Sequence, residues 1–180
     1  MTQFVFGVAF FMLSAVYVPY AVHSLALSAA GVGATLAAYG VGMIAGALAA
    51  HIIGALPFGT VIAIGPVTGF IAAALMALTI WMPSGALAAA SFFLMGAGPI
   101  VWMISTTTLR QDVTPAAMLG RASAINIMAY GSRPIGSARG AVAGGLYGAE
   151  ICLIIAAALF LIQALVIAAS PVPRIARQPL

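Results

Sequence analysis

Apolar residues fill this chain in six long runs, which short polar or proline-containing segments separate. An α-helix of about 20 apolar residues crosses the hydrocarbon core of a bilayer. The pattern therefore predicts an all-α polytopic membrane protein with six transmembrane helices, at about residues 4–27, 29–53, 58–82, 86–109, 120–147 and 151–169. Because the connecting segments are short, consecutive helices are expected to be antiparallel neighbours.

Polar residues mark the ends of these runs. Ser28 stands where a side-chain hydroxyl would cap the second helix. Residues 110–119 are polar and are expected to form a loop between the fourth and fifth helices. Residues 1–170 are thus expected to form one six-span transmembrane domain, and residues 171–180 a cytoplasmic tail.

The composition excludes a soluble globular protein. Hydrophobic residues make up 64% of the 180 residues, and charged residues only 4%. So few charged side chains cannot keep the surface of a soluble domain of this length hydrated. All six basic residues are arginines that stand within or at the ends of the spans, so the net charge of +4 does not indicate a nucleic-acid partner.

The arginines are distributed unevenly between the two sides of the predicted bundle. One side carries both termini together with Arg110, Arg121, Arg174 and Arg177, whereas the opposite loops carry only Glu150. Loops rich in arginine and lysine stay on the cytoplasmic side of a membrane. Both termini are therefore expected in the cytoplasm, with the chain in a bacterial-type cytoplasmic (inner) membrane.

Glycines recur at every fourth position in the second and fifth predicted helices. Such stripes of small residues allow two helix backbones to approach closely. They predict helix interfaces at Gly42, Gly46, Gly136, Gly140 and Gly144. Tight packing without any further role is the alternative interpretation.

Arg133 is a charged residue in an apolar helix, where a charge costs several kcal/mol if it faces hydrocarbon. It lies about 18 Å along the helix axis from Arg121, which places it near the middle of the bilayer. Pro134 follows it and clashes with the carbonyl group of Tyr130, so a kink is expected. Arg133, Pro134, Tyr130 and Asn126 are therefore predicted to line a substrate pathway or to gate it. The alternative is that Arg133 pairs with backbone carbonyls of a neighbouring helix.

Three further charged residues lie in or beside the predicted cytoplasmic loop. Arg110, Asp112 and Arg121 could form a cytoplasmic gate with a partner bundle. Their alternative role is only to set the orientation of the chain.

The usual residues of enzyme sites are missing from the sequence. The predicted spans contain no carboxylate, and no group of histidine and cysteine residues has metal-ligand spacing. No phosphate-binding loop is present, and Cys152 is the only cysteine. We therefore expect no cofactor, no metal and no enzymatic activity, and proton coupling through a buried carboxylate would come from an absent half or would not occur.

Several stretches resemble a known family of transporters. The run AAGVGATLAAYGVGMIAG, which begins at Ala29, resembles the second span in the C-terminal half of major facilitator superfamily proteins. The segments LRQDVTP from Leu109, LGR from Leu119, RPIG from Arg133 and GGL from Gly144 resemble the loop and following span of the branch that includes siderophore exporters. The chain differs in having six predicted spans instead of twelve, and in having Ala50 and His51 where a charged motif recurs in the family.

The resemblance implies a C-terminal six-helix half built as a three-plus-three inverted repeat, in which the second and fifth helices are counterparts. It implies a secondary transporter, of the efflux type, that moves a small-molecule solute by alternating access. The first span lines the central cavity in the family, so Tyr17 and Tyr20 are expected substrate contacts. The expected partners are the lipid bilayer, the solute and a complementary six-span half or a second copy.

Two other classes of protein remain open at this point. A self-sufficient six-span membrane protein could homodimerise through its glycine-rich helix faces. A membrane-embedded enzyme is disfavoured, because the spans lack paired acidic or metal-binding residues.

Overall fold

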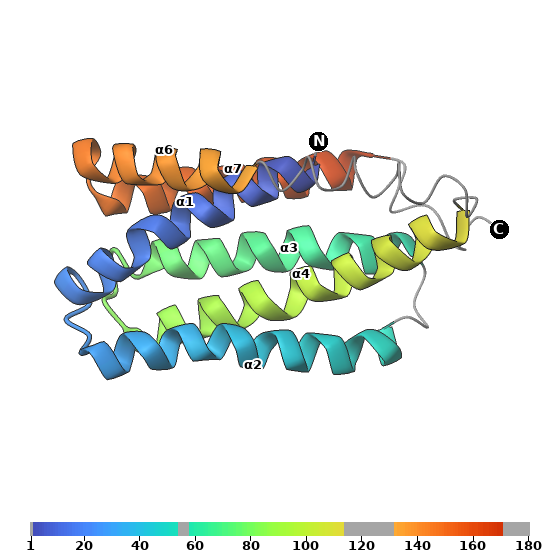
Figure 1. The fold of residues 1–180 in the computed structure, drawn as a ribbon, viewed down its shortest axis with the longest axis horizontal. Coiled ribbons are helices and arrows are strands. Elements are labelled where there is room, and N and C mark those ends of the chain that lie inside the picture. The colour runs from blue at the N-terminus through green and yellow to red at the C-terminus, as the bar shows by residue number, and fades with distance from the viewer. Residues whose placement is uncertain (1, 54–57, 114–131, 171–180) are drawn as a thin grey trace.

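The computed structural model describes residues 2–53, 58–113 and 132–170, and this part of the chain is helical with short connections. Its helices lie side by side along the long axis of the molecule (Figure 1). They are α1 (Thr2–His23), α2 (Ala29–Ile53), α3 (Phe58–Leu78), α4 (Gly85–Val113), α6 (Ser132–Tyr147) and α7 (Ala149–Ala169).

Five of these helices are long and apolar enough to cross a membrane. The remaining helix, α6, has 16 described residues and is not among those five. No strand occurs in the described ranges. The predicted all-α class is therefore confirmed, and the helices are compatible with an integral membrane protein. Residues 114–131, which include Arg121, Asn126 and Tyr130, lie outside the described residues.

Helix α2 has the predicted bounds, and its predicted cap is confirmed. The Ser28 hydroxyl accepts a hydrogen bond from the Gly31 amide at 3.2 Å, and the Ser28 carbonyl accepts one from Val32 at 2.9 Å. A serine at this place satisfies amide groups that have no acceptor inside the helix.

Three helix ends differ from the prediction. Helix α1 ends at His23, because the chain turns through Ala26 at a φ of 51°, and α3 ends at Leu78. An apolar run does not reveal where the backbone leaves the helix, since the turns after both helices are also apolar. Helix α4 continues to Val113, so Arg110 and Asp112 stand in its last turns and not in the predicted loop. Their side chains lie outside the described residues.

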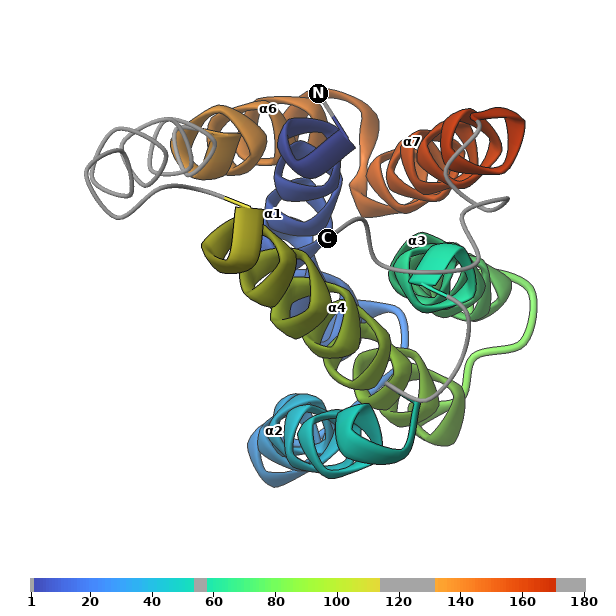
Figure 2. The ribbon, with the colours of Figure 1, turned by 90° about the vertical axis from the view of Figure 1, so that its right-hand side faces the viewer.

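Helix α4 makes the most extensive contacts among the described helices, with α2 and with α3. Helix α2 packs on α4, and α6 packs on α1. Helix α3 contacts both α4 and α7, and α7 also contacts α1. Viewed along the helices, α4 lies between α1 and α2 (Figure 2).

The glycine stripe of α2 lies against α4. A Cβ atom added at Gly42 would collide with the carbonyl oxygen of Phe93, and one at Gly46 would collide with that of Ala97. In return, a Cβ atom on Gly96 of α4 would collide with the carbonyl oxygen of Tyr39. Only residues without a side chain allow the two backbones to come this close.

The glycine stripe of α6 packs against α1 in the same way. A Cβ atom at Gly136 would lie 2.7 Å from the carbonyl oxygen of Val8, and one at Gly140 would lie 2.7 Å from that of Met12. At Gly144 the nearest atom is a methyl carbon of Val16, at 2.7 Å. Both stripes are thus helix interfaces within one chain, and neither is a free surface in this structure.

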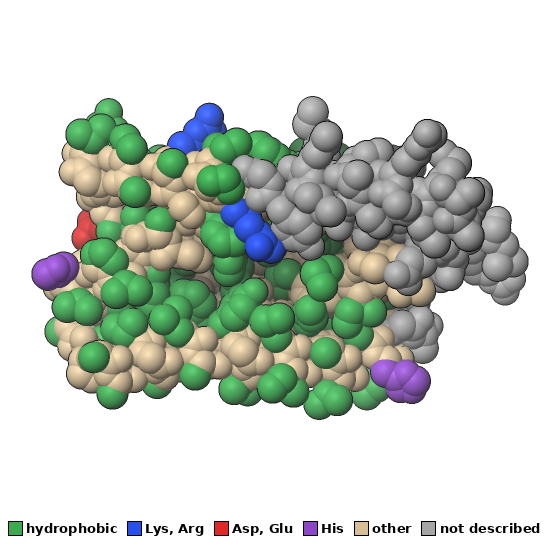
Figure 3. All heavy atoms as spheres, viewed as in Figure 1, with side chains coloured by type: hydrophobic (Ala, Val, Ile, Leu, Met, Phe, Trp, Pro, Cys, Tyr) green, Lys and Arg blue, Asp and Glu red, His purple; other side chains and the backbone are tan. Residues whose placement is uncertain are grey.

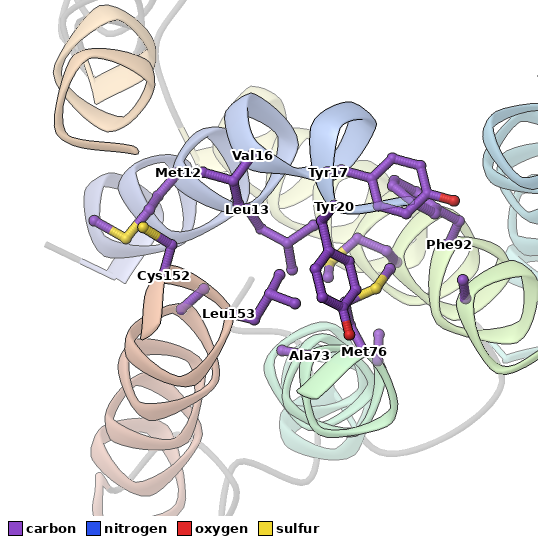
Figure 4. Packing of buried hydrophobic residues seen from close by; sticks show 14 of the residues in the cluster. Met12, Leu13, Val16, Tyr17, Tyr20, Ala73, Met76, Phe92, Cys152 and Leu153 are labelled. Atoms are coloured by element: carbon purple, nitrogen blue, oxygen red, sulfur yellow. The ribbon is translucent and has the colours of Figure 1, made fainter. Parts of the chain in front are cut away.

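The core of the molecule lies where α1, α3, α4 and α7 meet (Figure 4). Tyr20 extends from α1 toward Ala73 and Met76 of α3, while the ring of Tyr17 meets Phe92 of α4 edge-on at 4.5 Å between centroids. The buried Ser91 hydroxyl donates to the Ala72 carbonyl at 2.7 Å, which links α4 to α3. The core therefore extends along α1 from Ala9 to Ala21 and joins this helix to α3, α4 and α7.

We expect Gly46→Ala to destabilise the protein by about 1–3 kcal/mol, because the added methyl group forces α2 away from α4. Gly40→Ala is the matched control on the same helix, since no atom lies within 4 Å of a Cβ there. That variant should be neutral or more stable by up to about 1 kcal/mol, because alanine favours a helix over glycine. Unfolding in mixed micelles measures both variants. Equal stability of the two would contradict a close contact between α2 and α4.

Candidate functional site

A cavity of about 270 Å³ lies between four helices, beside the first half of α1 and the middle of α2 and α4. Helices α1, α2, α4 and α6 provide its described lining residues, and α3 and α7 provide none of them. The face shown in Figure 3 is largely hydrophobic and is hollowed between α6 and α2. The two histidines, at the ends of α1 and α2, lie at opposite ends of this face.

Aromatic rings form much of the cavity wall. The ring of Phe10 lies 6.0 Å from Phe6 and 5.7 Å from Tyr39, measured between centroids, and Phe6 lies 6.2 Å from Trp102. Phe11 meets Phe10 edge-on at 5.2 Å. These contacts connect α1 to α2 and to α4, so the rings form a continuous apolar wall around the space.

Residues with small side chains make room for the cavity between the rings. Gly7 of α1 and Gly96 and Pro99 of α4 are also lining residues. Gly96 also allows the backbone of α4 to contact α2 beside Tyr39. The same contact therefore joins the two helices and places the tyrosine at the cavity.

Arg133 is the only charged residue among the described lining residues. Its guanidinium carbon lies 5.5 Å above the centroid of the Phe11 ring, a cation–π arrangement. Gly136 lies one turn further along α6 and packs against Val8 and Phe11, so its close approach brings Arg133 over that ring. Arg133 is an exposed residue that lines the cavity.

Pro134 is exposed in the first described turn of α6, next to Arg133. The predicted kink involves Tyr130, which lies outside the described residues, as does Asn126. Two polar groups accompany Arg133 at the cavity, the amide of Gln3 and the hydroxyl of Tyr39. The described site therefore offers one positive charge, flat aromatic walls and two hydrogen-bonding side chains.

The two tyrosines predicted as substrate contacts lie elsewhere. Tyr17 is fully buried and Tyr20 is 2% exposed, and neither lines the cavity. The Tyr17 hydroxyl bonds to Thr35 of α2, and the Tyr20 hydroxyl lies 2.9 Å from the Thr79 hydroxyl after α3.

Both threonine hydroxyls donate to backbone carbonyls of their own chain segment, Thr35 to Val32 and Thr79 to Met76. Each threonine has one hydroxyl hydrogen, so in both pairs the tyrosine is the donor. A buried tyrosine needs such a partner because water does not reach it. Tyr17 and Tyr20 therefore connect helices in the core, which corrects the role predicted for them.

The predicted cytoplasmic gate falls on side chains that lie outside the described residues. Arg110 and Asp112 lie at the end of α4, and Arg121 lies outside the described residues. Among the side chains that the structure does describe, no group of three or more histidine, cysteine, aspartate or glutamate residues could hold a metal ion. The buried thiol of Cys152 faces the Gly140 carbonyl at 3.8 Å and belongs to the contact between α7 and α6.

Sequence reasoning missed most of the residues that line the cavity. They are chiefly Gln3, Phe6, Phe10, Phe11, Tyr39 and Trp102. One signal was present, because Gln3, Phe6, Phe10 and the neighbouring Gly7 recur at helical spacing on one side of α1. In a chain this apolar, however, the sequence pattern does not distinguish an aromatic residue that faces a cavity from one that faces lipid.

Comparison with known proteins gave no relative from which a role could be transferred. No protein-family model, curated protein or solved structure matches the chain.

Proposed function

We propose that this chain is the C-terminal six-helix half of a major-facilitator-type secondary transporter, of the efflux type. The cavity between α1, α2, α4 and α6 is its part of the substrate pathway. The observation that carries the proposal is the position of Arg133, whose charge lies on the wall of a cavity among helices long enough to cross a membrane. Charged residues at membrane depth mark substrate or ion pathways, because in hydrocarbon they cost several kcal/mol.

The packing of the helices supports a three-plus-three repeat. The stripe of α2 packs on α4, and the stripe of α6 packs on α1, in each case with steps of four residues on both helices. In such a repeat α1 corresponds to α4, α2 to α6 and α3 to α7. Under this correspondence the contact of α2 with α4 becomes the contact of α6 with α1, and the contact between α3 and α7 is preserved. Transporters built from inverted repeats place their substrate sites between the repeats, which is where this cavity lies.

The surface of α2 supports a partner for this bundle. Only 11% of its membrane-length window is buried, the smallest share among the candidate spans. Large side chains such as Ile44, Leu48 and Ile52 are 65–76% exposed. In the proposed transporter, lipid and a complementary six-span half cover this surface.

Both termini of the proposed transporter are cytoplasmic, and the membrane is the bacterial inner membrane. The arginine distribution along the sequence supports this orientation. With this orientation, the lining residues of α1 lie in its cytoplasmic half and those of α4 lie near its middle, and the packed core that contains Tyr17 and Tyr20 lies toward the outer end of α1.

A water-filled pathway predicts that Met103→Cys reacts with a positively charged, water-soluble thiol reagent in native membrane vesicles. Met103 lines the cavity and is 49% exposed, whereas Ile104, 37% exposed, is not a lining residue. In a Cys152→Ala background, Met103→Cys should react at least about tenfold faster than Ile104→Cys, because a thiol that faces lipid does not ionise. Alternating access further predicts reaction in both right-side-out and inverted vesicles. Equal rates at the two positions would contradict the pathway.

The orientation predicts opposite labelling on the two sides of the membrane. Met82→Cys, in the turn after α3, should react with an impermeant thiol reagent added outside intact cells, in the same Cys152→Ala background. Gln178→Cys, near the C-terminus, should react only after the membrane is permeabilised. The reverse result would place both termini outside.

A further inference from the structure

We infer that the cavity binds a small planar aromatic anion, with its ring between the aromatic side chains and its negative group at Arg133. This inference rests on the proposed function and names the class of substrate. The described lining residues combine flat apolar walls with the positive charge of Arg133, and these two features suit the aromatic ring and the negative group of such a molecule.

The charge of the site favours an anion. Arg133 is the charged lining residue, and the guanidinium group forms paired hydrogen bonds with carboxylate, sulfonate or phosphate oxygens. Gln3 and Tyr39 also line the cavity, and an amide and a hydroxyl can each donate a hydrogen bond to an anion. Glu150, the acidic residue whose side chain the structure describes, lies in the first turn of α7, which contributes no described lining residue.

A cation is the competing class, because aromatic side chains also bind cations through their ring faces. In this cavity the cation–π position over Phe11 is already taken by Arg133, at 5.5 Å from the ring centroid. A second positive charge nearby would be repelled by the guanidinium group. The occupied ring therefore argues against a cationic substrate.

The walls and the volume favour a small aromatic body. Phe6, Phe10, Tyr39 and Trp102 come from three helices and offer ring faces and edges at different angles. A planar ligand ring can stack on such surfaces, which a bulky saturated ring system cannot do as well. The volume of about 270 Å³ lies just below the range of about 300–1,000 Å³ that is typical of ligand pockets, so the ligand should have one or two rings.

Binding of radiolabelled 2-naphthoate to the 180-residue chain in lipid nanodiscs tests the inference, with three unlabelled competitors of matched size. Neutral 2-naphthamide keeps the rings and lacks the charge, and 2-naphthylmethylammonium reverses the charge. Decalin-2-carboxylate keeps the charge and lacks the aromatic system. We expect 2-naphthoate to bind at least about tenfold more tightly than each naphthyl competitor and about threefold more tightly than the saturated anion.

Two arginine variants separate a local contact from a general effect of charge. Arg133→Gln should remove the preference for 2-naphthoate over 2-naphthamide. Arg139→Gln removes the same charge from the same helix but at a residue that does not line the cavity, so it should keep the preference. Thermal unfolding of both variants checks that they are folded, and the competition series on the unmodified chain does not depend on either of them.

Absence of saturable binding, equal binding of the amide, or tighter binding of the ammonium compound would overturn the inference. A preference that survives Arg133→Gln would do the same. The reactivity of Met103→Cys does not involve a ligand and reports only on access of water. Reactive Met103→Cys without anion preference would therefore reject the substrate class alone, whereas an unreactive Met103→Cys would reject the pathway.

Discussion

Contact between glycine residues and backbone carbonyl groups determines how this bundle is built. Gly42 and Gly46 bring α2 against α4, and Gly136 and Gly140 bring α6 against α1. In a membrane, burial of apolar surface does not drive helices together, because lipid is as apolar as the side chains. Close van der Waals packing holds the helices together instead, so a single added methyl group at these positions affects the whole arrangement.

The cavity follows from the same contacts. Each glycine stripe holds a helix so close to its partner that the residues beside the stripe are fixed in position. Tyr39 precedes Gly42 by one turn and Arg133 precedes Gly136 by one turn, and both face the cavity. The aromatic wall, the position of Arg133 and the space between them are therefore consequences of how closely four helices pack.

The sequence predicted the long apolar helices, because an apolar run is a local pattern. A long apolar run predicts a span, and small residues four apart predict a close contact whatever the partner helix is. The partner itself could not be predicted, and neither could the roles of Tyr17 and Tyr20. Their burial depends on Thr35 and Thr79, which are distant in sequence and become neighbours only in the folded bundle.

The central claim is that one face of α2 borders an aqueous cavity while the rest of the helix meets lipid or protein. Spin labels placed singly at Tyr39, Val41, Met43, Ile44 and Leu48 test it through collisions with oxygen, which concentrates in lipid, and with a water-soluble nickel complex. The account predicts high nickel accessibility at Tyr39 and Met43, which line the cavity, and high oxygen accessibility at Val41, Ile44 and Leu48, which are exposed outside it. Oxygen accessibility that dominates at all five positions would contradict the account.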